Sequence, residues 1–368
     1  MGGMDRRVFL KTVGVTAGAA LASRLELLHG ATTVVKHTPP ATGVSGTPLI
    51  QAFILGAKDE RQLDALRNAA QRQGVQFFLK TEPLADAPSV AACAEQIRSN
   101  PPDGVLLITS ARTLPEHFRN ITQHFGAVPT IVCDAWMEPA LAIRLLATVW
   151  RMKNSRLCLV REKEQEFTVP VVGATVREIP QKRFEEWWLK LETSREMRAL
   201  ALSYSRAAGP ERDGLRMIDF LAASRRYFVM RRLLEAEKCH GIAVTAPAGL
   251  AVSCLLDEGV AADCGGDVDA LVSQQLALLL LQRPGETGEA SPTKLLGPMN
   301  PYRAEFVVRP GVGIVTVWPK EQAVTWMKLK DGTTMSLGEG DGRRLRVLGR
   351  HDAELRAFCR LAGIAVAA

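Results

Sequence analysis

Residues 254 to 284 read CLLDEGVAADCGGDVDALVSQQLALLLLQRP, and this stretch decides how the chain is interpreted. A short apolar run ends in the carboxylates of Asp257 and Glu258, and a glycine turn follows. Asp267 is a favourable N-cap, and apolar residues then recur at helical spacing until Pro284. Acidic side chains therefore collect at the positive end of an apolar helix, where converging oxygens can hold a cation or a polyol. A capped helix whose Gly-Gly turn only reverses the chain is the alternative interpretation.

The same stretch resembles a segment of the fucose/arabinose-isomerase-like proteins, in which a DEG(I/V)-x-A-A-C-E-x-D run precedes a long helix. The matching positions are Asp257, Glu258, Gly259, Ala262, Cys264 and Asp267. Gly265 stands where that family has a glutamate, a carboxylate that the resemblance assigns to a divalent metal. The resemblance therefore implies a sugar-isomerase fold with an altered metal site.

Two later segments extend this resemblance over most of the chain. Residues 291–298 (SPTKLLGP) are similar to the family's HC-x-x-PTK-L-x-G segment, but the His-Cys pair is missing. Residues 349–352 (GRHD) resemble the GDH start of the family's last helix. After the strand predicted at 241–245, residues 245–248 (TAPA) replace the acidic residue and cysteine of the family.

Aldose–ketose isomerisation moves a hydrogen between neighbouring sugar carbons. It requires a base, an acid and usually a divalent cation that polarises the sugar oxygens. The resemblance implies Glu258 and Asp267 as catalytic groups, Mn²⁺ or Mg²⁺ as cofactor, and Lys294 as a substrate contact. The surviving candidates for metal ligands are Asp263, Asp267 and His351. Two functions stay open: an isomerase-like enzyme with an altered or lost metal site, and a non-catalytic carbohydrate-binding or assembly protein on the same fold.

An α/β fold is indicated by short apolar strands that alternate with helices from Pro48 onward. In the first half the pattern predicts strands at 49–55, 75–79, 104–109, 129–134 and 156–161, and helices at 59–73, 89–99, 114–125 and 139–150. In the second unit it predicts strand structure within 169–178, long helices at 184–202 and 214–237, and a strand at 241–245. We therefore expect two doubly wound parallel-sheet domains, at 48–161 and 162–284.

Residues 285–368 are predicted to form a small β-barrel-like domain. Residues 285–289 (GETGE) are interpreted as a linker into it. Strands are predicted at 304–308, 313–318, 323–329, 334–337 and 345–348, followed by a closing helix at 352–362.

Asp134 and Trp136 follow the fourth predicted strand, and ligands usually lie at the carboxyl ends of parallel strands. An aspartate beside a tryptophan can accept hydrogen bonds from sugar hydroxyls while the indole stacks on the sugar ring. These two residues are therefore candidate substrate contacts. In the alternative interpretation, Asp134 caps the next helix and Trp136 packs in a core or an interface.

The first 22 residues have the form of a twin-arginine signal peptide, which predicts export to the periplasm. Arg6 and Arg7 precede a weakly apolar run, and residues 20–22 (ALA) form a cleavage signal. Residues 23–47 are predicted to be a disordered tether. The chain has 7 cysteines and lacks a CxxC pair, so we expect mostly free, buried thiols.

Charge and composition restrict the partners. The net charge of +7 is spread along the chain without a basic block interleaved with aromatics, which argues against nucleic acid. The apolar run of the signal is too short to span a membrane. On the helix predicted at 214–237, the Arg225-Arg226 and Arg231-Arg232 pairs suggest a phosphate patch, but a solvated helix face is the preferred interpretation. The resemblance implies a homo-oligomer that binds a sugar or polyol.

Overall fold

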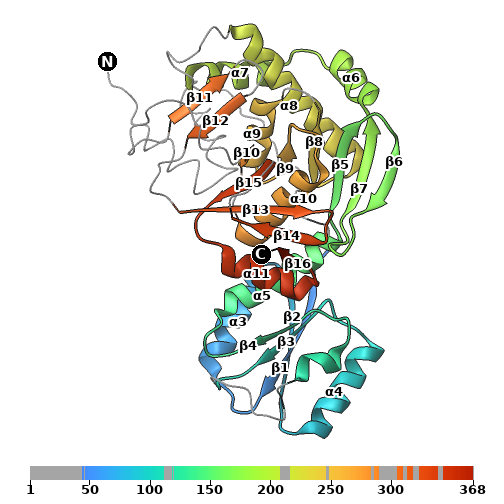
Figure 1. The fold of residues 1–368 in the computed structure, drawn as a ribbon, viewed down its shortest axis with the longest axis vertical. Helices are drawn as coiled ribbons and strands as arrows, with labels where there is room; N and C mark the ends of the chain where they lie inside the picture. The colour runs from blue at the N-terminus through green and yellow to red at the C-terminus, as the bar shows by residue number, and fades with distance from the viewer. Residues whose placement is uncertain are drawn as a thin grey trace.

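The computed structural model describes residues 44–367, with gaps at 45, 112–117, 119, 208–215, 246–247, 283–285, 290–304, 310–312, 318–322 and 339–342. The predicted signal peptide at 1–22, most of the predicted tether at 23–47 and the predicted substrate contact Lys294 lie outside the described residues. The described chain is a mixed α/β protein with two largely parallel sheets and a smaller C-terminal sheet. Figure 1 shows the two parallel sheets in separate lobes that meet at a narrow waist.

The first sheet contains four parallel strands in the order β2-β1-β3-β4. Its strands are β1 (Leu49–Leu55), β2 (Gln76–Leu84), β3 (Gly104–Ile108) and β4 (Thr130–Cys133). Its helices are α3 (Glu60–Arg72), α4 (Ala87–Ser99), the 3₁₀ helix η2 (Ile121–Phe125) and α5 (Pro139–Lys153). Helices α3 and α5 share a core with one face of β1, while α4 and η2 share a core with the other face. Every residue of β3 is buried, as expected of a strand that is covered on both faces.

The second sheet has the order β6-β7-β5-β8-β9. Its strands are β5 (Arg156–Arg161), β6 (Gln165–Thr168), β7 (Thr175–Pro180), β8 (Gly241–Val244) and β9 (Ala261–Asp263). Strand β6 is an antiparallel edge strand, and the other four strands are parallel. Their order, β7-β5-β8-β9, repeats the order β2-β1-β3-β4 of the first sheet, because in both sheets the first parallel strand in sequence lies between the second and the third. Strand β5 therefore belongs to the second sheet, and the predicted boundary at residue 161 falls after it. The charged residues 162–164 that follow β5 lead directly into β6.

The helices of the second unit are α6 (Gln181–Lys190), α7 (Arg195–Ala207), α8 (Met217–Glu237), α9 (Gly249–Asp257) and α10 (Val268–Leu276), which continues as the π-helix η4 (Ala277–Leu281). The single helix predicted at 184–202 is wrong, because the chain breaks between α6 and α7. The Ser194 hydroxyl accepts the N–H of Met197 at 3.2 Å, which starts a new helix there. Helices α6, α8 and α9 share a core with one face of the second sheet, and α10 shares a core with the other.

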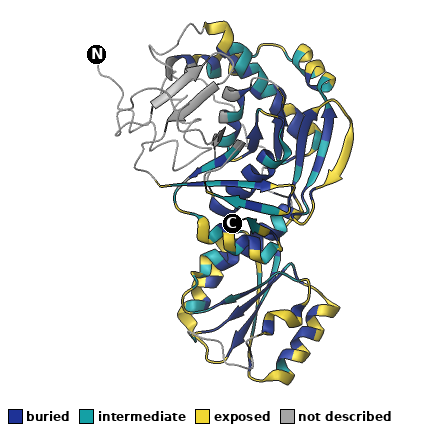
Figure 2. Ribbon diagram, viewed as in Figure 1, coloured by how far each residue is buried: buried dark blue, intermediate teal, exposed yellow. Residues whose placement is uncertain are grey.

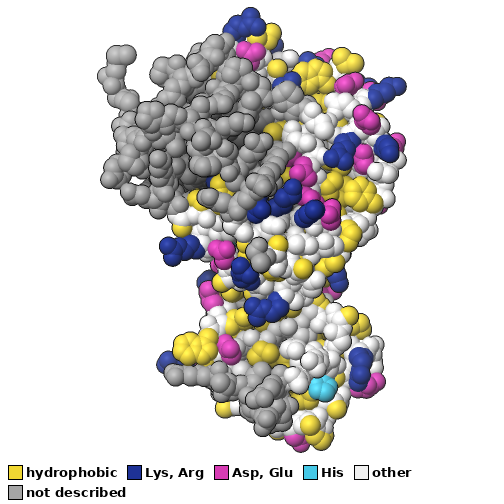
Figure 3. All heavy atoms as spheres, viewed as in Figure 1, with side chains coloured by type: hydrophobic (Ala, Val, Ile, Leu, Met, Phe, Trp, Pro, Cys, Tyr) yellow, Lys and Arg dark blue, Asp and Glu magenta, His cyan; other side chains and the backbone are white. Residues whose placement is uncertain are grey.

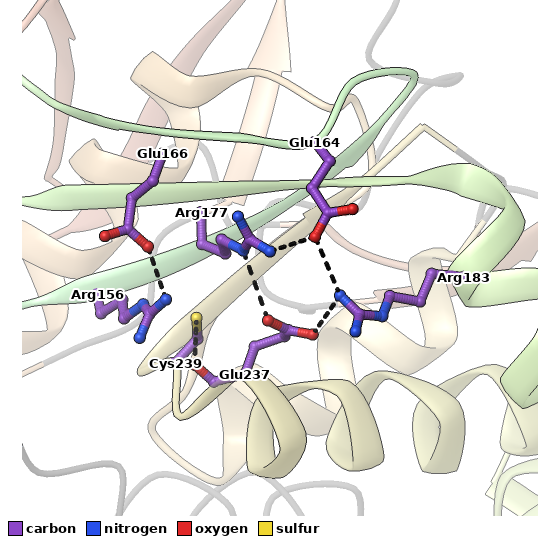
Figure 4. Close-up of polar contacts among 7 residues, drawn as sticks. All are labelled: Arg156, Glu164, Glu166, Arg177, Arg183, Glu237 and Cys239. Atoms are coloured by element: carbon purple, nitrogen blue, oxygen red, sulfur yellow. Dashed lines mark hydrogen bonds and ion pairs between the residues drawn. The ribbon is translucent and has the colours of Figure 1, made fainter.

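A network of ion pairs fastens the β6–β7 edge to α6 and α8 (Figure 4). Arg177 of β7 pairs with Glu164 just before β6 and lies 3.6 Å from Glu237 at the end of α8. Arg183 of α6 reaches the same two carboxylates, at 3.0 Å from Glu237 and 3.6 Å from Glu164. The β6–β7 hairpin is thus held to α6 and α8 by ion pairs in which Arg183 and Glu237 of the two helices take part.

The C-terminal module is an open sheet in the described residues rather than the predicted barrel, with the order β10-β15-β13-β14-β16. Its elements are β10 (Glu286–Glu289), β13 (Val324–Lys330), β14 (Thr334–Leu337), β15 (Arg343–Leu348), α11 (Asp352–Ala362) and β16 (Ala365–Ala367); β11 (Glu305–Arg309) and β12 (Gly313–Val317) form a separate hairpin. The segment interpreted as a linker at 285–289 therefore contains strand β10. The sheet is fixed to α10, because the Ser273 hydroxyl accepts the N–H of Leu329 at 3.0 Å.

Helix α5 joins the lobes. Its buried residues are Ala142, Ile143, Leu145, Leu146, Ala147, Thr148, Val149 and Met152. All of these except Thr148 belong to one continuous hydrophobic core that includes residues of α3, α10, η4 and α11. Figure 2 shows this buried band crossing the waist between the lobes. A helix that is apolar nearly all round has no face for solvent, which accounts for its position between the units.

The cysteines are free thiols, as expected: six are buried and Cys264 is half-buried. Burial raises the pKa of Cys93, Cys133 and Cys359 to about 11 in each case. The thiolate is therefore disfavoured at these positions, which are inert structural thiols. In the described part of the chain, none of the helices combines the length and hydropathy that crossing a bilayer requires.

Leu145→Ala is expected to lower the free energy of unfolding by about 2–5 kcal/mol, because it opens a cavity in the shared core. Leu189→Ala is the matched control, since the Leu189 side chain is 80% exposed, and its effect is expected to stay within about 0.5 kcal/mol. Urea denaturation followed by circular dichroism measures both. Equal losses for the two variants would show that α5 is not the central support.

His240 joins the starts of β5 and β8. The ring Nδ1 of His240 accepts the backbone N–H of Arg156 at 2.9 Å, and the backbone N–H of His240 donates to the Arg156 carbonyl at 2.7 Å. Burial lowers the pKa of His240 from its ordinary 6.5, and the charge of Arg156 acts in the same direction. The folded state therefore favours the neutral imidazole, so this stabilisation is present above the ordinary pKa and is lost as pH falls below it.

His240→Asn is expected to make stability less dependent on pH between about pH 7.5 and about pH 5.5, because the amide oxygen keeps an acceptor that does not titrate. Urea midpoints at the two pH values measure the effect. An unchanged difference between those midpoints would contradict the role assigned to His240.

Candidate functional site

Three parallel strands of the second sheet end side by side at a polar edge. The pairing of Val160 with Val244, and of Ala243 with Asp263, places the ends of β5, β8 and β9 next to one another. The residues at these ends are Arg161, Thr245 and Asp263. Such carboxyl edges are the usual ligand positions in open α/β sheets, particularly where successive connections leave in opposite directions, as they do between β5 and β8.

The Gly265-Gly266 loop crosses this edge and is fixed from both sides. Asp263, only 1% exposed, accepts the N–H of Gly265 through Oδ2 at 2.8 Å. Arg161 Nη2 donates to the Gly266 carbonyl at 2.7 Å. Gly266 has a φ of +62°, and a Cβ at this position would lie 2.3 Å from Thr245 Cγ2. Glycine is therefore required at 266 both by its conformation and by its close approach to β8.

Asp267 is the N-cap of α10, as predicted, and its Oδ1 accepts the N–H of Asp269 at 2.9 Å. Asp269 in turn accepts the N–H of Asp331 from the β13–β14 turn at 2.9 Å. Burial raises the pKa of Asp269, and the carboxylates of Asp267 and Asp331 act in the same direction. The first turn of α10 thus links the strand ends to the C-terminal sheet.

Glu258, predicted to be a catalytic group, lies at the opposite edge of the sheet. It is the C-cap of α9, and the chain then turns at Gly259 to begin β9, at whose far end Asp263 lies. Three residues of β9 separate the two edges, which corresponds to roughly 10 Å at about 3.3 Å per residue. The structure therefore does not bring Glu258 together with Asp263 or Asp267.

Glu258 instead belongs to a contact between α8 and α9. The Tyr227 hydroxyl donates to Glu258 Oε1, and Arg231 Nη1 donates to the Tyr227 oxygen at 2.9 Å and lies 3.6 Å from Glu258 Oε1. Burial raises the pKa of Tyr227 far above its ordinary value, and the adjacent Glu258 charge adds to this. Glu258 thus compensates a guanidinium that is 8% exposed, so its role here is structural.

The prediction that the four arginines of α8 form a solvated helix face is wrong for three of them. Arg231 is buried, and the guanidinium carbons of Arg225 and Arg226 lie 5.1 and 5.5 Å from the centre of the Trp188 ring. These cation–π contacts hold α6 against α8. Arg232 alone of the four is exposed.

His351 lies in the C-terminal module, at the N-cap position of α11. Its N–H donates to Thr325 Oγ1 at 2.9 Å, and its Nδ1 is 3.5 Å from Glu354 Oε2. The predicted ligands therefore lie at three different places: Asp263 at the glycine loop, Asp267 at the start of α10 and His351 at the start of α11. Across the described ranges, no group of three or more His, Cys, Asp or Glu side chains is placed to hold a metal ion.

Asp134 and Trp136 shape a rigid turn at the carboxyl edge of the first sheet. Asp134 Oδ1 accepts the N–H of Trp136 at 2.9 Å and that of Met137 at 3.0 Å. The Trp136 side chain is 72% exposed, so it is not the core residue of the alternative interpretation. Asp134 is engaged with the backbone of its own turn, so its carboxylate caps this turn as the alternative interpretation expects of a capping residue.

Arg161 and Thr245 were not among the residues singled out from the sequence. Arg161 ends the apolar run of β5, and Thr245 directly follows that of β8. A polar residue at the end of an apolar strand indicates a site residue only once the two strands are known to be parallel neighbours.

Gly266→Ala is expected to destabilise the protein by about 1–3 kcal/mol, because it forces a side chain into the left-handed region and against Thr245. Gly265→Ala is the matched control: this neighbour is exposed and does not have a positive φ, so a change within about 0.5 kcal/mol is expected. Thermal or urea unfolding compares them. A Gly265→Ala loss as large as that of Gly266→Ala would contradict the described loop.

Comparison with protein-family models gave no match for this chain, and comparison with curated proteins gave none either. The resemblance to the fucose/arabinose-isomerase-like proteins therefore rests on sequence motifs alone. The functional argument rests on the geometry of the described residues.

Proposed function

We propose that the protein binds a sugar or polyol at the carboxyl edge of its second sheet and does not catalyse isomerisation. The observation that carries this proposal is the bond from Arg161 to the Gly266 carbonyl, which fixes a guanidinium across the ends of three strands. In this proposal the two parallel sheets are doubly wound domains of isomerase-like type. Export to the periplasm and assembly into a homo-oligomer, as the sequence implies, stay predictions.

The groups at this edge suit hydroxyl-rich ligands. A guanidinium supplies several N–H donors in a fixed plane, and a threonine hydroxyl both donates and accepts. Arg161, Thr245 and Gly265 are exposed, so a ligand can reach all three. A neutral polyol can exchange its water hydrogen bonds for these contacts without bringing an uncompensated charge to the site.

Isomerisation is disfavoured by the arrangement of the carboxylates. The reaction needs a base within hydrogen-bonding reach of the sugar carbon that loses its proton. Glu258 lies at the other edge and is engaged by Tyr227 and Arg231. Asp263 is engaged by the backbone of Gly265, where the family has its metal-binding glutamate.

Titration calorimetry with a panel of pentoses, hexoses and polyols, in buffer containing a chelator, tests the binding. We expect at least one compound to bind, and Arg161→Ala to weaken that binding by about tenfold, the loss of roughly one charge-assisted hydrogen bond. Arg232→Ala is the matched control, because it removes an exposed arginine of α8 far from the strand ends. Failure of every compound to bind, or equal weakening by both variants, would refute the proposal.

A second experiment separates binding from catalysis. The unmodified protein and Gly265→Glu are incubated with Mn²⁺ and the sugar that binds, and the ketose is measured. We expect no turnover by either, because restoring a carboxylate at 265 does not bring Glu258 to the same edge. Turnover by the unmodified protein would establish the isomerase instead.

A further inference from the structure

A groove of about 220 Å³ lies in the C-terminal module, between α11 and β16. It is lined by Arg356 and Arg360 of α11, by Ile364 and by Val366 of β16. The groove belongs to neither carboxyl edge described above. Figure 3 shows Lys and Arg side chains on the surface over α11, at the waist of the molecule.

The two arginines are placed to act together. They are four residues apart on α11, so they lie on the same face of the helix. Both are exposed, and neither forms an ion pair with the residues that the structure describes. Between them and the sheet, Ile364 is 5% exposed and Val366 is half-buried, which provides an apolar floor.

Strand β16 leaves one edge of its sheet unpaired within the described residues. It pairs with β14 in parallel, with Ala365 opposite Thr334 and Ala367 opposite Ser336, and it ends the strand order of the sheet. Its outer edge therefore presents backbone N–H and C=O groups to which an extended chain can add as a further strand.

We propose that this groove docks an extended acidic segment of a partner protein, which pairs with β16 and places carboxylates against Arg356 and Arg360. The charge of the groove selects the partner, since two guanidinium groups that form no ion pair within the described part of the chain favour an anionic segment. A second copy of this chain is disfavoured, because its own net charge is +7. Successive side chains of a strand point to opposite faces, so the matching segment alternates acidic and apolar residues.

Fluorescence anisotropy with a labelled decapeptide of alternating Glu and Val tests the proposal. The protein carrying both Arg356→Glu and Arg360→Glu is expected to bind the peptide at least about tenfold more weakly than the unmodified protein, because two attractive pairs become repulsive. The matched control carries Arg67→Glu and Arg98→Glu on the exposed faces of α3 and α4, with the same change in net charge. The control is expected to bind nearly as well as the unmodified protein.

Two further peptides test the mode of binding. A Lys-Val peptide is expected not to bind, and a Glu-Val peptide N-methylated at alternate backbone nitrogens is expected to lose most of its affinity, because it cannot complete the strand pairing. Three results would each overturn the proposal: no binding of the Glu-Val peptide at millimolar concentration, equal weakening by the control variant, or full competition by free glutamate, which would indicate a site for small anions.

Discussion

Burial of α5 from two sides is the constraint on which the rest of the structure depends. One side of the helix packs on α3 and the first sheet, and the other meets α11 and η4. Each fully buried leucine or isoleucine contributes about 1.5–3 kcal/mol, so neither unit can leave the other without exposing a costly surface. The helix begins shortly after the Asp134 turn and ends at Lys153, three residues before β5 begins at Arg156. Its position therefore fixes both the edge of the first sheet and the start of the second.

Helix α10 occupies the equivalent place in the second unit, after the fourth strand of the repeated order, and it too is buried on both sides. Two of its buried polar side chains are hydrogen-bonded inside the protein: Gln275 donates to Ser155 Oγ at 3.2 Å, and Ser273 accepts the N–H of Leu329. With the helix fixed, its N-cap Asp267 cannot move independently of the strand ends. The glycine loop between β9 and α10 must then fit the space that remains beside Thr245, which explains the glycine at 266.

Local signals in the sequence were sufficient for most elements. The bounds of β1, β5, β14 and α11 agree with those predicted, because apolar periodicity and capping residues mark them directly. The errors came from information that is not local. The break at Ser194 depends on a hydroxyl that competes with helix continuation, and strand β6 depends on its antiparallel pairing with β7. Glu258 is five positions from Asp263 in the sequence, yet a strand separates them, so proximity in sequence suggested a shared site that the topology divides.

The proposed polyol site differs from a cation site in the groups that lie at the strand ends. Affinity for Mn²⁺ or Mg²⁺ rises with the number of carboxylates, and Gly265 removes one of those that the resemblance implies. Arg161 has the opposite effect, because a guanidinium tied to the Gly266 carbonyl adds a positive charge to the same loop. A dication entering there would meet repulsion from Arg161, and Asp263 and Asp267 are already engaged by backbone N–H groups. A neutral ligand meets no such repulsion and can use the guanidinium as a donor. The guanidinium and the engagement of both carboxylates are therefore the features that support hydroxyl groups, rather than a metal ion, as the ligand of the proposed site.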